Sequence, residues 1–183
     1  MKKKNLIRIV LLALAVFFLQ NSVKAQDDKE KEKEKLLSEC TKAKSEFVKA
    51  DASMSKLFDN SFGYVIFPKN GKGGFIVGGS GGNGTVYEKG KEIGSAKMAQ
   101  VTVGAQVGGQ AYREVIFFEN KEALDRFKDN KVEFSGQISA VAAKSGASKN
   151  AKYTDGVAVF TQDIGGLMAE AAVGGQKFTY KAF

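Results

Sequence analysis

The sequence predicts an α+β fold: a glycine-rich, mainly antiparallel β-sheet, curved or barrel-like, with an N-terminal helical segment and one short helix near 121–128. Three observations support this class. Apolar residues between 36 and 57 recur with a helical period, short β-branched and aromatic runs recur between 64 and 180, and glycine rather than proline separates those runs.

The helical period is regular. Seven apolar side chains follow one another at alternating steps of four and three: Leu36, Cys40, Ala43, Phe47, Ala50, Met54 and Leu57. Such spacing places them on one face of a helix. That face either docks on the domain core, which we favour, or lies on a membrane surface. Asp51 marks a break and could cap a second short helix that runs to Phe58.

Runs of β-branched and aromatic residues predict the strands. They lie at 64–67, 74–77, 85–87, 100–107, 115–118, 138–143, 157–160, 167–172 and 177–180. Turns are predicted at 68–71, which begins with Pro68, and at 88–91, which contains Gly90. The segment 78–84 holds five glycines, so it is either a loop or a distorted strand.

The short helix follows from its own signals. Asn120 has a side chain that is common at a helix N-cap. The negative charge of Glu122, in the first turn, would interact favourably with the positive end of the helix dipole. Leu124 and Phe127 stand three residues apart and form the expected buried face of a helix over 121–128.

The first 25 residues are typical of a cleaved signal peptide. Basic residues from Lys2 to Arg8 precede an unbroken apolar run over 9–19, and Val23 and Ala25 supply the small residues of a cleavage site before Gln26. The alternative is an uncleaved anchor, but a run of 11 residues is well short of the roughly 20 that span a membrane. We therefore expect an exported protein in the periplasm, associated with the envelope, or secreted.

Cleavage would change the charge of the chain. The segment 1–25 holds five of the 28 basic residues and none of the 20 acidic ones, so the net charge would fall from +8 to +3. Such a mild excess does not indicate nucleic-acid binding, which usually shows a strong basic stripe. Residues 26–35 alternate acid and base, as expected of a solvated linker or a frayed helix start. Residues 36–183 are long enough for a single domain.

Several kinds of chemistry are excluded by composition. The chain has no histidine and one cysteine, Cys40, which removes Ser-His-Asp and Cys-His catalysis, most zinc sites and any intramolecular disulfide. Residues 79–84 match the GxGxxG pattern, but a strand rather than a helix should follow, so we expect no nucleotide. Asp155, Asp163 and Glu170 remain candidate carboxylates for a hydrolase, although their positions fit turns and single strand sites. We expect no catalysis, cofactor or metal.

Lysines in the predicted loops are the remaining candidate site. Two lie in the first predicted turn region and three in the late basic segment 144–152: Lys69, Lys72, Lys144, Lys149 and Lys152. If the sheet brings these loops together, five ammonium groups would face an anionic lipid surface, each contributing about 1 kcal/mol. The alternative is ordinary solvated lysines.

An ordered series of motifs resembles the SYLF domain, also called the Ysc84 actin-binding domain. It comprises GYVIFP from Gly63, GGFIVGG from Gly73, GAQVGGQ from Gly104, EVI from Glu114, the Leu124–Phe127 pair, the 135–143 strand, and the glycines of 165–166 and 174–175. The chain departs from the family pattern at Arg113–Glu114 and at Ser145–Gly146, where a Gly-Pro is common.

That resemblance implies phospholipid binding, including phosphoinositides in eukaryotic members, some of which also bind actin. It supplies no catalytic residues. We therefore predict a non-enzymatic module that binds a phospholipid or anionic membrane surface outside the cytoplasm. The alternative is an envelope structural or protein-interaction protein with a protein partner, for which an actin role is doubtful in an exported chain.

Overall fold

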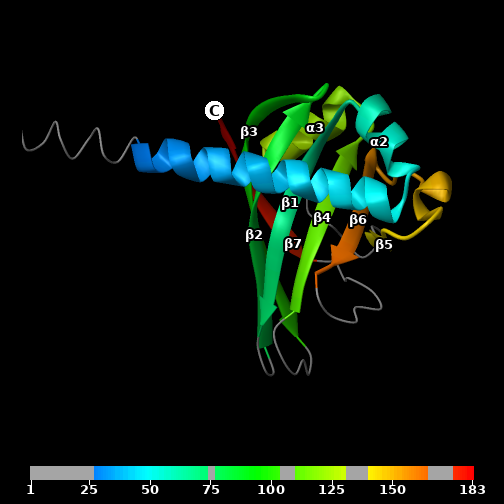
Figure 1. Cartoon of the computed structure of the whole chain (residues 1–183). Coiled ribbons are helices and arrows are strands. Elements are labelled where there is room, and N and C mark those ends of the chain that lie inside the picture. The colour runs from blue at the N-terminus through cyan, green and yellow to red at the C-terminus, as the bar shows by residue number, and fades with distance from the viewer. Residues whose placement is uncertain (1–26, 74–76, 104–109, 131–139, 165–174) are drawn as a thin grey trace, which may run out of the picture. The chain divides into compact units, whose positions relative to one another are not determined.

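The computed structural model describes residues 27–73, 77–103, 110–130, 140–164 and 175–183 (Figure 1). Two compact units divide at Leu37 and Ser38. Helix covers 27–50, so the charged stretch 27–35 is helical, one of the two alternatives that its sequence allowed. The predicted signal peptide and the runs at 74–76, 104–107, 138–139 and 167–172 lie outside the described residues.

The unit from Ser38 onward is built on a curved seven-stranded sheet. Its order is β5-β6-β4-β1-β2-β3-β7, and every pair is antiparallel except β5 with β6, which is parallel. The strands are β1 (Gly63–Gly73), β2 (Val77–Glu88), β3 (Lys91–Val103), β4 (Gln110–Phe118), β5 (Ala140–Ala142), β6 (Val157–Asp163) and β7 (Gln176–Ala182). The predicted α+β class with a curved, mainly antiparallel sheet is confirmed.

The turn predicted at 68–71 is wrong, because β1 continues through it to Gly73. The register of β1 against β4 shifts between Phe67 and Asn70, as it does in a β-bulge. Proline has no backbone N–H, so in a regular strand it would interrupt the hydrogen-bond ladder. A bulge tolerates Pro68 because the ladder is already disrupted there. The glycine-dense segment 78–84 is part of β2. At Gly84 a Cβ would lie 2.7 Å from the Phe67 ring, so glycine lets the two strands pack closely.

One face of the sheet is covered by residues 38–50 of the N-terminal helix and by α2 (Met54–Asn60) (Figure 1). The Cys40 thiol donates to the Ile66 carbonyl at 3.4 Å, and Gln162 on β6 donates to the Glu46 carbonyl at 3.4 Å, so the helix crosses from β1 to β6. Cys40, Phe47 and Met54 are fully buried. The apolar stripe therefore docks on the sheet rather than standing free for a membrane.

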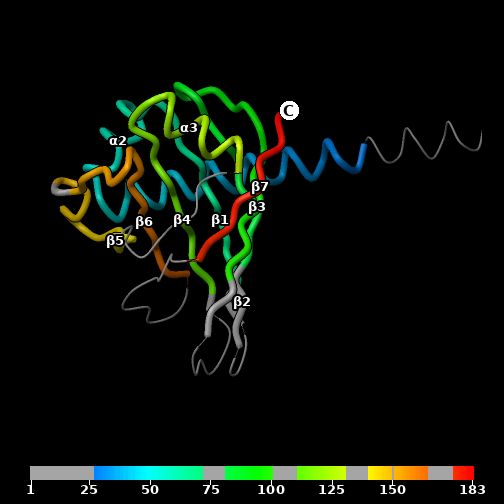
Figure 2. The backbone as a smooth tube through the Cα atoms, turned by 180° about the vertical axis from the view of Figure 1, so that it is seen from behind, coloured from blue at the N-terminus to red at the C-terminus, as the bar shows by residue number. Residues whose placement is uncertain are grey.

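The opposite face packs against α3 (Lys121–Lys128) (Figure 2). Asn120 caps this helix by accepting a hydrogen bond from the Ala123 N–H at 3.0 Å, as predicted. Leu124 and Phe127 are fully buried in the cluster that includes Phe118 and Phe178. The contact between Phe127 and Phe178, with ring centroids 5.2 Å apart, joins α3 to β7 at the edge of the sheet.

The segment between β5 and β6 contains the short 3-10 helix η1 (Ala147–Asn150). Asp51, at the end of the N-terminal helix, anchors it: its carboxylate accepts from the Ser148 N–H at 2.7 Å and from the Ser53 N–H at 3.0 Å. Asp51 thus stands before α2 as predicted, although the N-cap position itself is Ser53.

Candidate functional site

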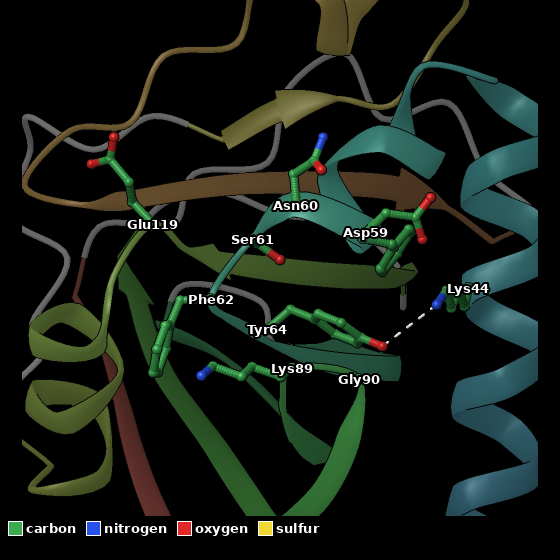
Figure 3. Close-up of a pocket in the computed structure, with 10 residues that line it drawn as sticks. Lys44, Asp59, Asn60, Ser61, Phe62, Tyr64, Lys89, Gly90 and Glu119 are labelled. Carbon is green, nitrogen blue, oxygen red and sulfur yellow. Dashed lines mark hydrogen bonds between the residues drawn. The ribbon is translucent and has the colours of Figure 1, made fainter.

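An open pocket of about 530 Å³ lies where α2 meets the first strand, at the ends of β2 and β4 (Figure 3). Its walls come from the N-terminal helix, α2, the start of β1, the turn between β2 and β3, and the residue that follows β4. Its lining residues are Lys44, Phe58, Asp59, Asn60, Ser61, Phe62, Tyr64, Lys89, Gly90 and Glu119.

Backbone hydrogen bonds fix the frame of this pocket. The Phe62 N–H donates to the Phe118 carbonyl at 2.9 Å, and the Lys89 N–H donates to the Phe62 carbonyl at 2.9 Å. Lys89 and Gly90 have φ values of 49° and 77° and form the two-residue turn between β2 and β3. Positive φ at both central positions is typical of a type I′ hairpin, so the turn predicted at 88–91 is confirmed.

Two lysines stand over aromatic rings of the pocket. The Lys44 ammonium lies 4.8 Å from the Phe58 ring centre, 5.4 Å from that of Tyr64, and donates to the Tyr64 hydroxyl at 3.5 Å. The Lys89 ammonium lies 5.3 Å from the Phe62 ring centre. Among the described residues, neither lysine has a carboxylate within 4.0 Å. Their charges are held in place by the rings and remain available to an anion.

The other polar groups of the pocket are a hydroxyl pair and two acids. Burial raises the pKa of the Tyr64 hydroxyl, so Tyr64 stays protonated near neutral pH. Ser61 is 8% exposed, and its hydroxyl has no hydrogen-bond partner. Asp59 and Glu119 are exposed at the rim, so the lining carries two positive and two negative charges.

A second polar site is buried beneath α3, between β4 and β7. Glu114 is fully buried, and its Oε2 accepts from the Gln176 Nε2 at 2.9 Å. Among the described residues, neither its other oxygen, Oε1, nor the side-chain oxygen of Gln176, also Oε1, has a hydrogen-bond partner. Burial raises the pKa of Glu114 to about 7, and the bond from Gln176 opposes that rise only in part.

The structure does not gather the five predicted lysines. Lys69 and Lys72 belong to β1 rather than to a loop, at the end remote from the pocket (Figure 1). Lys144, Lys149 and Lys152 are exposed in the segment that joins β5 to β6, and β4 and β6 lie between that segment and β1 in the sheet. The five lysines thus come from two separate parts of the fold, and a lipid-binding role for them stays a prediction.

Of the candidate acids for hydrolysis, the two that the structure describes lie at opposite ends of β6. Asp155 is exposed in a turn with φ of 50°, Asp163 ends β6, and Glu170 lies outside the described residues. Within the described ranges no three His, Cys, Asp or Glu side chains group closely enough to hold a metal ion. In the same residues, no helix has the length and apolar character needed to cross a membrane.

The sequence does not predict Lys44 and Lys89 as binding residues. They stand 45 positions apart and share no motif. Lys44 lies off the apolar stripe of its helix, and Lys89 lies within the predicted turn at 88–91, so neither position by itself predicts a binding site.

Comparisons with known proteins place this chain in context. Residues 99–181 match the family model Ysc84, described as "Las17-binding protein actin regulator". A curated relative, "Beta cell expansion factor A" from Aeromonas veronii, is 30% identical over 126 residues, which cover 69% of this chain and 48% of that protein. The chain thus spans about half the length of this relative. Of the pocket residues, only Glu119 lies within 99–181.

Proposed function

We propose, because this chain belongs to the SYLF (Ysc84) family, that it is a non-enzymatic module that binds phospholipid membranes peripherally, outside the cytoplasm. The family is one of binding modules and is associated with lipid binding and actin regulation. The observation that carries the proposal is the pair of lysines at the pocket. Each ammonium group lies over an aromatic ring and, among the described residues, has no carboxylate within 4.0 Å, which suits the phosphate of a lipid headgroup.

Vesicle co-sedimentation tests this proposal. The purified protein is mixed with vesicles of phosphatidylcholine, phosphatidylethanolamine and phosphatidylglycerol. The double variant Lys44→Met plus Lys89→Asn is mixed with the same vesicles in a parallel experiment. Methionine keeps the apolar stem of Lys44 on its rings, and asparagine suits the positive φ at position 89. Each lysine near an anionic surface contributes about 1 kcal/mol, so binding should weaken roughly 30-fold.

A matched control has the same change in charge. Lys97→Thr plus Lys177→Thr removes two exposed lysines from β3 and β7, away from the pocket. It should bind vesicles as the unmodified protein does. Replacing the five lysines first predicted from the sequence by glutamate tests whether they add to binding. Equal binding by the pocket variant and the control would contradict the role of the pocket, and no sedimentation at all would contradict the function.

The proposed location rests on the segment 1–25. Amino-terminal sequencing of the protein from fractionated cells should find Gln26 as the first residue, outside the cytoplasm. An uncleaved Met1 in the cytoplasmic fraction would contradict it.

The second candidate is a protein-interaction role, which the family description as an actin regulator favours. Affinity capture from an envelope fraction would then recover one stoichiometric protein, with no phospholipid in the purified sample. That result, together with failed sedimentation, would replace the lipid proposal.

A further inference from the structure

One hydrogen bond joins two strands that are not neighbours in the sheet. The strands β1, β2 and β3 stand between β4 and β7 in the sheet order. The sheet nevertheless curves so far that Gln176, at the start of β7, donates to Glu114 on β4 at 2.9 Å, across the face that packs against α3 (Figure 2). This side-chain bond therefore holds together two strands that share no ladder in the described sheet.

The carboxyl group in this bond has little to stabilise it as an anion. Glu114 is 0% exposed. Among the described residues, the Gln176 amide is its one hydrogen-bond donor, and no lysine or arginine nitrogen lies within 4.0 Å of its oxygens. A buried carboxylate needs several donors or a cation to offset the hydration that it loses. Ionisation of Glu114 is therefore costly as long as it stays covered.

The neighbours of Glu114 on this face offer no positive charge. The described polar and titratable side chains there are Tyr112 on β4, Asn70 on β1, Thr161 and Asp163 on β6, Gln100 on β3 and Gln176 on β7. The buried side chains of α3 are apolar. Asp163 is a second acid, so its charge would oppose rather than favour a charge on Glu114. Water is thus the remaining source of stabilisation for the ionised group.

The strand that carries the donor can be released at the least cost. β7 lies at the edge of the described sheet and pairs with β3 along one side. Its other side is fastened at Tyr180, whose N–H donates to the Asn130 side chain at 2.8 Å, whereas Gln176 lies four residues earlier, where the strand begins. Edge strands and strand ends open locally without unfolding of the whole domain. Separation of the first residues of β7 would therefore be enough to hydrate Glu114.

We infer that the bond from Gln176 to Glu114 is a latch that one proton operates: protonated Glu114 keeps the start of β7 closed on the sheet, and its ionisation favours a locally open state. In the open state water hydrates the carboxylate, and the buried contact between Phe67 and Phe178, with ring centroids 5.8 Å apart, becomes accessible. The proton leaves to solvent, and no covalent bond between heavy atoms changes. This latch is separate from the lipid pocket, so its test is independent of the proposed function.

Amide hydrogen exchange, followed by NMR from pH 5 to pH 8, tests the latch. Because the Tyr180 N–H points away from β3, the alternation of an antiparallel strand directs the N–H groups of Lys177 and Thr179 toward β3. Their exchange reports the opening of β7. After correction for the intrinsic rates it should rise roughly 70-fold, since the pKa of the carboxyl group is about 7 when it is buried and the usual 4.5 when it is hydrated.

Urea separates local opening from global unfolding. Exchange that requires global unfolding accelerates steeply with urea because unfolding exposes much surface, whereas local opening depends on urea only weakly. Lys177 and Thr179 should show the weak dependence, and Val65, on the central strand β1, should show the steep one. Equal urea dependence of all three amides throughout the pH range would overturn the inference.

Variants assign the effect to Glu114. Glu114→Gln keeps an acceptor for Gln176 but cannot ionise, so exchange at Lys177 and Thr179 should not rise with pH. The control Glu122→Gln removes an exposed acid from α3 and should keep the roughly 70-fold rise. A rise that persists in Glu114→Gln would overturn the assignment.

Infrared spectroscopy of the unmodified protein gives a second measurement that needs no variant. With ¹³C-labelled glutamate, the C=O band of one protonated carboxyl group should be present at pH 6, where exposed glutamates are ionised. It should disappear over the pH range in which the exchange of Lys177 and Thr179 rises. A band that is absent at pH 6 would overturn the inference even if Glu114→Gln fails to fold.

Discussion

Asp51 and Glu114 are both buried carboxylates, yet they ionise in opposite ways. Asp51 lies at the junction of the N-terminal helix with η1 and is 2% exposed, and Glu114 lies between β4 and β7 and is 0% exposed. Burial opposes ionisation of Asp51, but hydrogen bonds from Ser148, Ser53 and Gly146 outweigh it and lower the pKa to about 2. Burial dominates at Glu114, where one bond from Gln176 leaves the pKa at about 7.

The difference shows that the supply of donors, rather than depth alone, decides the charge of a buried acid. Two backbone N–H groups point at Asp51 because Ser148 lies in the first turn of η1 and Ser53 directly precedes α2, where N–H groups have no acceptor within the helix. Glu114 stands inside a sheet, where neighbouring N–H groups are used by the strands themselves. The interior of a sheet therefore raises the pKa of a carboxyl group, and the single bond from Gln176 offsets that rise only in part.

Removing the Asp51 carboxylate should have the largest effect. In Asp51→Ala the N–H groups of Ser148 and Ser53 lose their acceptor, so the free energy of unfolding should fall by about 3 kcal/mol. Urea unfolding at pH 7 measures this. Asp51→Asn keeps one acceptor oxygen and should lose less. A change below about 0.5 kcal/mol in Asp51→Ala would mean that these bonds form equally well with water.

Glu114 should make the protein less stable as the pH rises. Its folded pKa of about 7 exceeds the usual 4.5, so between these values the unfolded chain gives up its proton while the folded one keeps it. The contribution of Glu114 to the free energy of unfolding should thus be greatest below pH 4.5, fall by about 3 kcal/mol up to pH 7, and then stay level. Because the chain has no histidine, no other side chain ordinarily titrates there. Glu114→Gln should abolish this slope, and a slope unchanged in that variant would refute the assignment.

Gln176→Met tests the single donor to Glu114 at nearly constant volume. It should cost about 1–2 kcal/mol near pH 5, where Glu114 is neutral, because one buried hydrogen bond is lost. The midpoint of the pH-dependent loss should also move upward, since the bond from Gln176 lowers the pKa. Thermal unfolding across pH 4–9 measures both. A midpoint that moves downward would contradict this view of the pair.

Periodic and capping signals were strong enough to predict much of the fold. The apolar stripe that includes Cys40, Phe47 and Met54 is buried, and Asn120 caps its helix, both as predicted. Each of these signals depends on residues within one or two helical turns of one another. The error at Pro68 arose because a proline in a bulge and a proline in a turn look alike along the chain. Only pairing with β4 distinguishes them.

The sites were much less predictable. Lys44, Asp59, Lys89 and Glu119 come from four separate elements, and only the completed sheet brings them to one pocket. Glu114 stood out in the sequence merely as a departure from a family pattern, since nothing near it revealed that Gln176, 62 residues away, would be its partner. Contacts of this kind depend on curvature of the sheet, which no local pattern encodes.

The strand β7 lies at the outer edge of the sheet, where its backbone could pair with a second molecule. Along it, Gln176 and Phe178 point inward, and Lys177, Thr179 and Lys181 are exposed. Two copies aligned edge to edge would place rows of like charge side by side, a common protection against aggregation. The same lysines that contribute nothing to the pocket would thus help keep a glycine-rich β protein from forming fibrils.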